Sequence, residues 1–381
     1  MALQFRATTP TVSDLTLHLQ MPGIPSPEQT ELRGIFFPAE WFPQSGVQLT
    51  WPHEATDWHD YLGDVDDCYV RIALEILVRG ERLLVVTPEP ERIKALAHTR
   101  LPSRLLAHIS YFECPTNDTW ARDHAPLTLI TEQGPRLLDF CFNGWGQKFA
   151  SNHDNMISRR LLGQDGAEAA LHGAYEPMLD FVLEGGSIES DGHGTLLTTT
   201  ECLLSSNRND MLSRDEIEQR LLRWLHSERV LWLEYGYLAG DDTDSHIDTL
   251  ARFCSPDTIA YVRCDDPQDE HYDELKLMEQ QLQSFRTAAD EPYQLVPLPL
   301  PRPVLDPDDG HRLPATYANF LVINRAVLMP TYGQPDIDEL AERQLRKAFP
   351  RHDIVAIDCS VLVRQHGSLH CSTMQYPIGV L

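Results

Sequence analysis

The chain has 381 residues, of which 42% are hydrophobic and 23% are charged, a composition typical of a globular protein that buries its core without disulfide or metal cross-links. Its 57 acidic residues outnumber the 31 basic ones, and the formal net charge is −26. This charge argues against nucleic acid or an acidic membrane surface as a partner, because both are strongly negative. It favours a small cationic ligand, although acidity can also serve solubility alone.

We expect a cytoplasmic protein. The first thirty residues contain no apolar segment of signal-peptide length, and the sequence has no apolar run of about 18 residues that could span a membrane. The eight cysteines form no C-x-x-C pair, so the spacing of zinc or thioredoxin-like sites is missing. We therefore expect reduced thiols, no metal and no cofactor. The sequence leaves open whether the chain forms a homo-oligomer.

In chain order, residues 1–30 hold four prolines and little periodicity, which predicts an N-terminal arm, and residues 31–381 are expected to form a single domain. Apolar spacing predicts helices near Val65, near 155–162, after Ser213 and near Ile337. The third opens with the capping-box pattern of Ser213 and Glu216. Short apolar and β-branched runs predict strands at 109–114, 127–131, 137–140, 178–183, 195–199, 202–205, 230–233, 320–323, 326–329 and 354–358.

The predicted elements repeat one order. Strand, strand, helix and strand follow one another three times, over residues 127–183, 195–233 and 320–358. Repetition of one α/β unit is typical of a solenoid or of a radial propeller. Polar segments around Asp123, Glu184 and residues 240–248 each follow a predicted strand. In a radial arrangement these strand ends would converge on one axis and share one site.

Two segments contain groups suited to catalysis. Cys371 follows a histidine and small residues, and a thiolate in such a turn is a candidate nucleophile. A buried cysteine that only packs is the alternative. The segment 241–248 (DDTDSHID) collects five ionisable groups. If it is extended, His246 and Asp248 point to the same face, which places a proton carrier beside a carboxylate. The alternative is a solvated acidic loop that binds calcium.

Two further carboxylates complete the candidate set. Asp123 lies close to Trp120, and Glu184 precedes two glycines. A salt bridge with Arg122 is the structural alternative for Asp123, and a capping or turn role is the alternative for Glu184. Carboxylates, a histidine and a thiol without metal spacing suit a guanidinium, which is planar and is held bidentately by carboxylates. A thiolate beside such a cation can attack its central carbon.

Eight segments carry a resemblance to a known family: 37–41 (FPAEW), 117–126 (NDTWARDHAP), 142–146 (FNGWG), 183–192 (LEGGSIESDG), 197–204 (LTTTECLL), 240–253 (GDDTDSHIDTLARF), 317–320 (YANF) and 369–371 (LHC). Together and in this order they resemble the agmatine deiminase and bacterial peptidyl-arginine deiminase family of guanidino-group-modifying enzymes. The resemblance implies a five-bladed α/β propeller (pentein) with the active site at its central axis.

The resemblance also implies roles for individual residues. Cys371 matches the nucleophile and His246 the acid/base residue. Asp123 and Asp248 match the guanidinium-binding carboxylates. Glu184 matches a site carboxylate that orients His246, and Trp120 matches an aromatic wall of the substrate channel.

One segment departs from the family pattern. Agmatine deiminases usually have the form G-G-G-x-x-H-C before the nucleophile, whereas this chain reads QHGSLHC over residues 365–371. Only Gly367 is retained, and it is expected to let the backbone approach the substrate. The departure leaves the chemistry intact but keeps free arginine and peptidyl arginine open as substrates.

The expected reaction is hydrolysis of agmatine to N-carbamoylputrescine and ammonia through a covalent thiouronium, a step towards putrescine. The first alternative is deimination of peptidyl or free arginine to citrulline. A further alternative is a non-catalytic propeller that binds a cationic ligand or a metal through residues 241–248.

Overall fold

The computed structural model describes residues 34–381, so the N-terminal arm expected over residues 1–30 lies outside the described part. Most strands belong to five sheets. The first sheet has the order β18 (Thr373–Pro377), β1 (Gln44–Thr50), β2 (Arg82–Thr87), β3 (Ile109–Glu113). Strand β18, near the C-terminus, thus pairs with β1, so this sheet joins the two ends of the described chain.

The other four sheets have three strands each, and a short hairpin stands apart from them. Their strands are β4 (Leu127–Leu129), β5 (Arg136–Cys141) and β6 (Ala174–Val182); β7 (Ile188–Ser190), β8 (Thr195–Thr199) and β9 (Arg229–Leu233); β10 (Ala251–Ser255), β11 (Thr258–Arg263) and β12 (Gln294–Pro299); and β15 (Leu321–Ile323), β16 (Ala326–Thr331) and β17 (Asp353–Asp358), with the hairpin formed by β13 (Val304–Leu305) and β14 (Arg312–Leu313).

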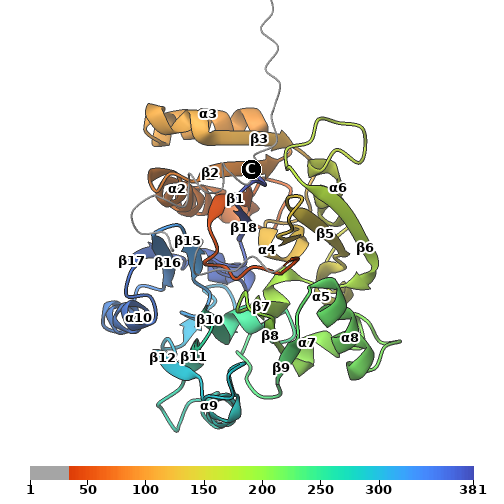
Figure 1. Cartoon of the computed structure of the whole chain (residues 1–381). Helices are drawn as coiled ribbons and strands as arrows, with labels where there is room; N and C mark the ends of the chain where they lie inside the picture. Colours follow the sequence, from red (N-terminus) through yellow and green to blue (C-terminus); the bar gives the residue numbers. More distant parts are fainter. Residues whose placement is uncertain (1–33) are drawn as a thin grey trace, which may run out of the picture.

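All five sheets share one pairing rule. The first strand is antiparallel to the second, and the second is parallel to the third. Parallel strands need a crossover connection, and helices supply it here. The helices are α2 (Leu62–Val78), α3 (Pro90–Arg100), α4 (Ala121–His124), α5 (Gly144–Gln147), α6 (Ile157–Leu161), α7 (Thr200–Leu203), α8 (Arg214–Trp224), α9 (Tyr272–Ser284) and α10 (Pro335–Ala348). The longer helices lie outside the strands, around a common centre (Figure 1).

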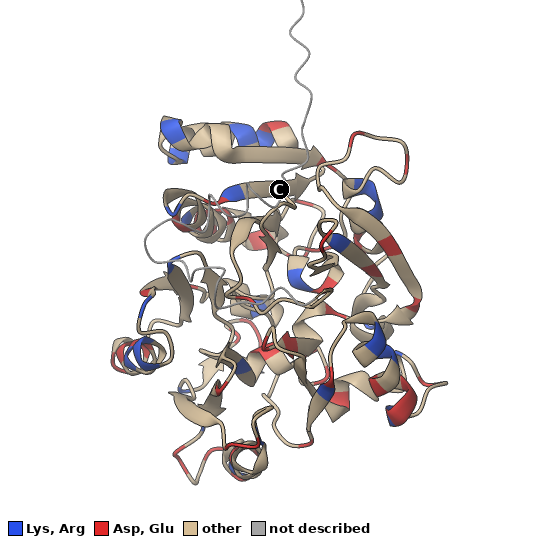
Figure 2. Ribbon diagram, in the orientation of Figure 1, with Lys and Arg blue, Asp and Glu red and all other residues tan. Residues whose placement is uncertain are grey.

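Short 3₁₀ helices lie at several chain reversals: η2 (His59–Tyr61), η3 (Ser103–His108), η4 (Asp154–Met156), η5 (Gly185–Ser187), η6 (Ile247–Thr249) and η7 (Leu362–Gln365). On two outer helices, charge follows the helix dipole. Helices α3 and α10 carry acids in their first turn and bases in their last turn, and Figure 2 shows the charged residues of both helices in colour. This placement stabilises each end of the helix. Within residues 34–381, no helix has the length and apolarity that a membrane crossing requires.

The local predictions hold for most elements. Helix α8 begins after Ser213 with the complete capping box, and strands β8, β9, β16 and β17 lie where the sequence places them. The predicted strand at 202–205 is wrong. The Thr199 hydroxyl accepts a hydrogen bond from the Cys202 amide and caps α7 there. The antiparallel partner of β8 is instead β7, which precedes it in the chain.

A second local prediction is also wrong. The sequence treats residues 246–248 as extended, whereas the chain turns into η6 directly after His246. Asp244 and Ser245 precede this turn with positive φ angles of 63° and 61°. His246 and Asp248 still face the same interior region, but a tight turn rather than strand alternation places them there.

Candidate active site

The predicted site residues come from four separate segments that meet in the interior. Asp123 is on α4, Glu184 precedes η5, His246 and Asp248 flank the start of η6, and Cys371 precedes β18. Gly186 shows how closely they gather. A Cβ on this residue would lie 2.7 Å from His246 Nδ1, 2.8 Å from Asp123 Oδ1 and 3.1 Å from Asp248 Oδ2. Only glycine leaves room for these three groups.

Cys371 is buried, with 4% of its surface exposed. Its Sγ lies 3.6 Å from Asp248 Oδ2 and accepts a hydrogen bond from Asn319 Nδ2 at 3.2 Å. Burial, and then the charges of Asp248 and Asp123, raise the pKa of the Cys371 thiol well above its ordinary value. The sulfur is therefore a thiol while the two acids beside it are not balanced by a cation.

The carboxylates of Asp123 and Asp248 have different hydrogen-bond partners. Asp123 accepts hydrogen bonds from Trp145 Nε1 and the Gly186 amide, both at 2.9 Å. Burial, and then the neighbouring Asp248, raise the pKa of Asp123 to about 8. Asp248 Oδ2 lies 2.7 Å from His370 Nδ1. Burial alone would raise the pKa of Asp248, but the hydrogen bond and charge of His370 hold it below its ordinary value.

His246 is fully buried and lies 3.7 Å from Asp123 Oδ1. Among the described residues, neither of its ring nitrogens has a hydrogen-bond partner. Burial lowers the pKa of His246 to about 3, although the charge of Asp248 acts in the opposite direction. The ring is thus neutral at physiological pH and can accept a proton. Asp248 Oδ1 also lacks a partner within the described chain.

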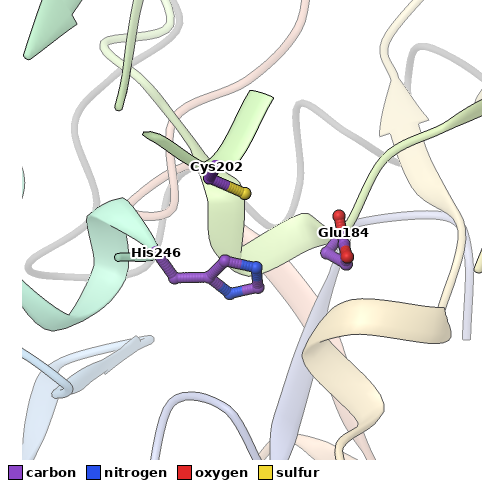
Figure 3. A group of neighbouring side chains, drawn as sticks. All are labelled: Glu184, Cys202 and His246. Carbon is purple, nitrogen blue, oxygen red and sulfur yellow. The ribbon is translucent and has the colours of Figure 1, made fainter. Parts of the chain in front are cut away.

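Glu184 is fully buried, and its carboxylate is held by Arg208 Nε at 2.9 and 3.1 Å. Within residues 34–381 no hydrogen bond joins Glu184 to His246, the residue that the resemblance expects it to orient. Polar atoms of Glu184, Cys202 and His246 do lie within 4.8 Å of one another (Figure 3), a spacing that could hold a metal ion. The guanidinium of Arg208 already balances the one carboxylate of this group, so the donor set does not suit a divalent cation.

A pocket of about 560 Å³, counted with its open mouth, leads to Cys371 and Asp123. Trp120 and Gly367 form one wall. A Cβ on Gly367 would lie 2.3 Å from the Trp120 ring, so this glycine is required by contact with the indole. The remaining lining residues are Asp57, Asp118, Trp145, Phe149, Asp242, Thr243, Gln365 and His366. Among the described residues, the lining therefore includes four aspartates and no Lys or Arg.

His366 occupies a position at which the resembled family has a glycine. Its φ of 65° lies in the left-handed region, which explains why glycine suits this position. The side chain compensates through contacts: Nδ1 lies 2.7 Å from the Gly240 carbonyl oxygen, and the ring stacks on His311 with centroids 5.4 Å apart. The departure from the family motif thus places an imidazole among the residues that line the pocket.

Two alternatives left open by the sequence lose support. Arg122 does not pair with Asp123; it donates to Gln375 Oε1 at 2.6 Å. The acids of segment 241–248 do not converge on a calcium site. Asp241 accepts from Thr243 and Ser245 at 2.7 Å, whereas Asp244 pairs with Lys148 and Arg208.

Sequence reasoning missed three residues that contact the site: Asn319, His370 and Trp145. The Asn319 carboxamide accepts the amides of His370 and Cys371 at 2.9 and 3.2 Å while donating to the sulfur. All three residues lie in the motif segments 317–320, 369–371 and 142–146. Isolated polar or aromatic residues have no spacing signal, so only the tertiary contacts reveal what they do.

Comparisons with known proteins agree with this geometry. A solved structure of a Porphyromonas gingivalis protein, provisionally named an arginine deiminase, is 52% identical, covers 91% of this chain and 99% of its own, and superposes with a TM-score of 0.84. A Cys-to-Ser variant of C. jejuni agmatine deiminase with substrate bound is 36% identical, with coverage of 90% and 96% and a TM-score of 0.80.

Agmatine deiminase from Stutzerimonas stutzeri is 33% identical over 366 residues, which are 90% of this chain and 96% of that protein. The model of the Porphyromonas-type peptidyl-arginine deiminase family matches residues 36–377. The match spans nearly the whole described chain and includes every residue gathered around Gly186. The chain therefore belongs to the Porphyromonas-type peptidyl-arginine deiminase family.

Proposed function

We propose that the chain hydrolyses agmatine to N-carbamoylputrescine and ammonia, with Cys371 as nucleophile, and that its five sheets form a five-bladed α/β propeller around the site. The shared pairing of all five sheets supports the propeller. The single observation that supports the reaction best is the placement of one thiol, one neutral imidazole and two carboxylates around Gly186. Agmatine deiminases with matching length support the substrate.

In the proposed binding step, Asp123 and Asp248 hold the guanidinium from two sides. A cation between these acids offsets the charges that keep the Cys371 proton in place, so binding of the substrate favours the thiolate. The acids also orient the flat group so that its central carbon faces the sulfur. Trp120 contributes an aromatic wall, and Gly367 lets that wall lie close to the chain.

The proposed chemistry is balanced without a cofactor. The sulfur bonds to the guanidinium carbon while its proton passes to His246. His246 then protonates one nitrogen, which leaves as ammonia, and a thiouronium remains on Cys371. Water attacks that carbon and gives a proton to His246. The C–S bond breaks, the sulfur regains a proton, and the remaining proton leaves on ammonia as ammonium.

The acidic pocket favours agmatine over arginine. Agmatine and arginine both carry an ammonium group, but arginine has an α-carboxylate beside it. Asp57, Asp118 and Asp242 line the pocket. A carboxylate next to these acids would be repelled, and no Lys or Arg among the described lining residues would pair with it. Arginine or peptidyl arginine is the second candidate. The Porphyromonas gingivalis protein, which is provisionally named an arginine deiminase, is 52% identical to this chain.

A parallel assay tests both candidates. Purified protein is incubated with agmatine, arginine or an arginyl peptide, and ammonia and ureido product are measured. We expect kcat/KM to be highest for agmatine. A higher kcat/KM for arginine or the arginyl peptide would show that the second candidate, and not agmatine, is the preferred substrate. Absence of product from all three substrates would contradict the deiminase proposal.

A further inference from the structure

A row of charged groups in the interior is joined to the site by hydrogen bonds. It runs from Asp248 through His370 to Glu40 and Arg252, and none of the last three lines the pocket that reaches Cys371. His370 and Glu40 instead line a separate hollow, which Arg122 and Glu189 also border. The side chain of His370 therefore reaches the site through Asp248, to which its Nδ1 is hydrogen-bonded.

His370 makes the connection. Its Nδ1 lies 2.7 Å from Asp248 Oδ2, and its Nε2 lies 2.7 Å from Glu40 Oε2 and 3.0 Å from a nitrogen of Arg252. A carboxylate can only accept, so Nδ1 carries a hydrogen and donates to Asp248. Nδ1 carries this hydrogen in either protonation state of the ring. If Nε2 donates to Glu40, the ring is a cation, and if Nε2 accepts from Arg252, the ring is neutral.

Ion pairs and hydrogen bonds hold the outer end of the row, which consists of Glu40 and Arg252. Arg252 is fully buried, pairs with Glu40 at 2.6 Å and with Glu189, and donates to the Phe320 carbonyl at 2.7 Å. Glu40 Oε1 accepts the Val322 amide at 2.6 Å. Burial would raise the pKa of Glu40, but the charges of Arg252 and His370 hold it well below its ordinary value.

We propose that His370 is a positioning residue that keeps Asp248 ionised and turned so that Oδ1 faces the substrate. The inference rests on the proposed deiminase function. Oδ2 is occupied by His370, whereas Oδ1 is buried and has no partner among the described residues. A guanidinium N–H can therefore bind Oδ1 without displacing an existing hydrogen bond. His370 itself does not touch the substrate.

The test compares His370→Ala, His370→Asn and a matched control, His271→Asn. In His370→Asn, the side-chain amide nitrogen occupies the place of Nδ1 and can donate to Asp248 without charge. His271 is also buried, and its Nδ1 also lies 2.7 Å from an aspartate, Asp269, outside the site. The kcat/KM for agmatine is measured against pH, and folding is checked by thermal unfolding.

We expect His370→Ala to lower kcat/KM roughly 10- to 100-fold, because it leaves a buried carboxylate without its donor. Below the limb set by Asp123, the profile should steepen where Asp248 also takes up a proton. Because the pKa of Asp248 rises in this variant, this lower break should move to higher pH by about one unit. His370→Asn should recover most of the activity with a smaller shift, and His271→Asn should keep the wild-type profile.

An unshifted lower break in a folded His370→Ala or His370→Asn would overturn the inference. If His370→Ala does not fold, His370→Asn decides, since a profile identical to that of His271→Asn excludes a positioning role. The proposed function fails in a different way: wild-type protein would then release no ammonia from agmatine. A wild type that is active and a His370 variant with the wild-type profile would refute only the positioning role.

Discussion

The floor and the mouth of the pocket are built in opposite ways. At the floor, Cys371, His246 and Asp248 are almost completely buried. Burial raises the pKa of Cys371 and lowers that of His246, whereas His370 holds the pKa of Asp248 below its ordinary value against the effect of burial. At the mouth, Asp57 is exposed, and Asp242 has 38% of its side chain exposed. Charges in water are screened and worth little, whereas buried charges act strongly over short distances. The floor can therefore perform chemistry, whereas the mouth can select only weakly for the charge of what enters.

The largest effect should come from the floor. We expect Cys371→Ala to reduce kcat for agmatine by at least about 10⁴-fold, because no covalent intermediate can form. Cys254→Ala is the matched control, since Cys254 is also a free, buried cysteine but lies on β10. Both variants should unfold at similar temperatures. Turnover by Cys371→Ala at the wild-type rate would remove the thiol from the mechanism and abolish the contrast between floor and mouth.

The pH dependence of kcat/KM reports on the ionisation of Asp123 at the floor. Asp123 must be ionised to bind the guanidinium, and its pKa is raised to about 8. The kcat/KM for agmatine should therefore rise as pH increases through about 8. Trp145→Phe removes the indole donor that lowers this pKa, so its acid limb should lie at higher pH. An acid limb that remains in place in Trp145→Phe would show that another group controls it.

A smaller effect is expected at the mouth. Asp118 lines the pocket, and burial raises its pKa to about 6, with Asp57 adding to the shift. We expect Asp118→Asn to raise KM for agmatine roughly three- to fivefold, because one partner of the ammonium is lost. Activity on arginine should change little. Asp265→Asn, which removes an exposed charge elsewhere, is the control; an equal rise in KM there would assign the effect to net charge.

The smallest effect should follow metal removal. We expect EDTA to leave kcat and KM for agmatine unchanged, because the proposed steps use only side chains and water. The measurement compares treated protein with protein supplied with calcium or zinc. Activity that is lost with EDTA and restored by one of these ions would indicate a metal site, for which the group of Glu184, Cys202 and His246 is the first candidate.

Local sequence patterns determined much of the fold. The capping box at Ser213 starts α8, and the apolar stripe after Ile337 supplies Ala341 and Leu345, the buried residues of α10. Such signals are readable because backbone hydrogen bonds and burial act over a few neighbouring residues. The error at 202–205 has the same physical origin, since one hydroxyl, that of Thr199, decides between a strand and a helix.

The sequence alone determined the residue types available for chemistry and, through ordered motifs, the family. Only the tertiary structure decided that Arg208 holds Glu184, that His370 supports Asp248, and that Asn319 reaches the sulfur. These pairs are 24, 122 and 52 positions apart in the chain. Burial raises the pKa of both Asp123 and Asp248, and the contact with His370 then separates them by lowering the pKa of Asp248. Dielectric surroundings and long-range contacts are properties of the packed chain, so no local pattern encodes them.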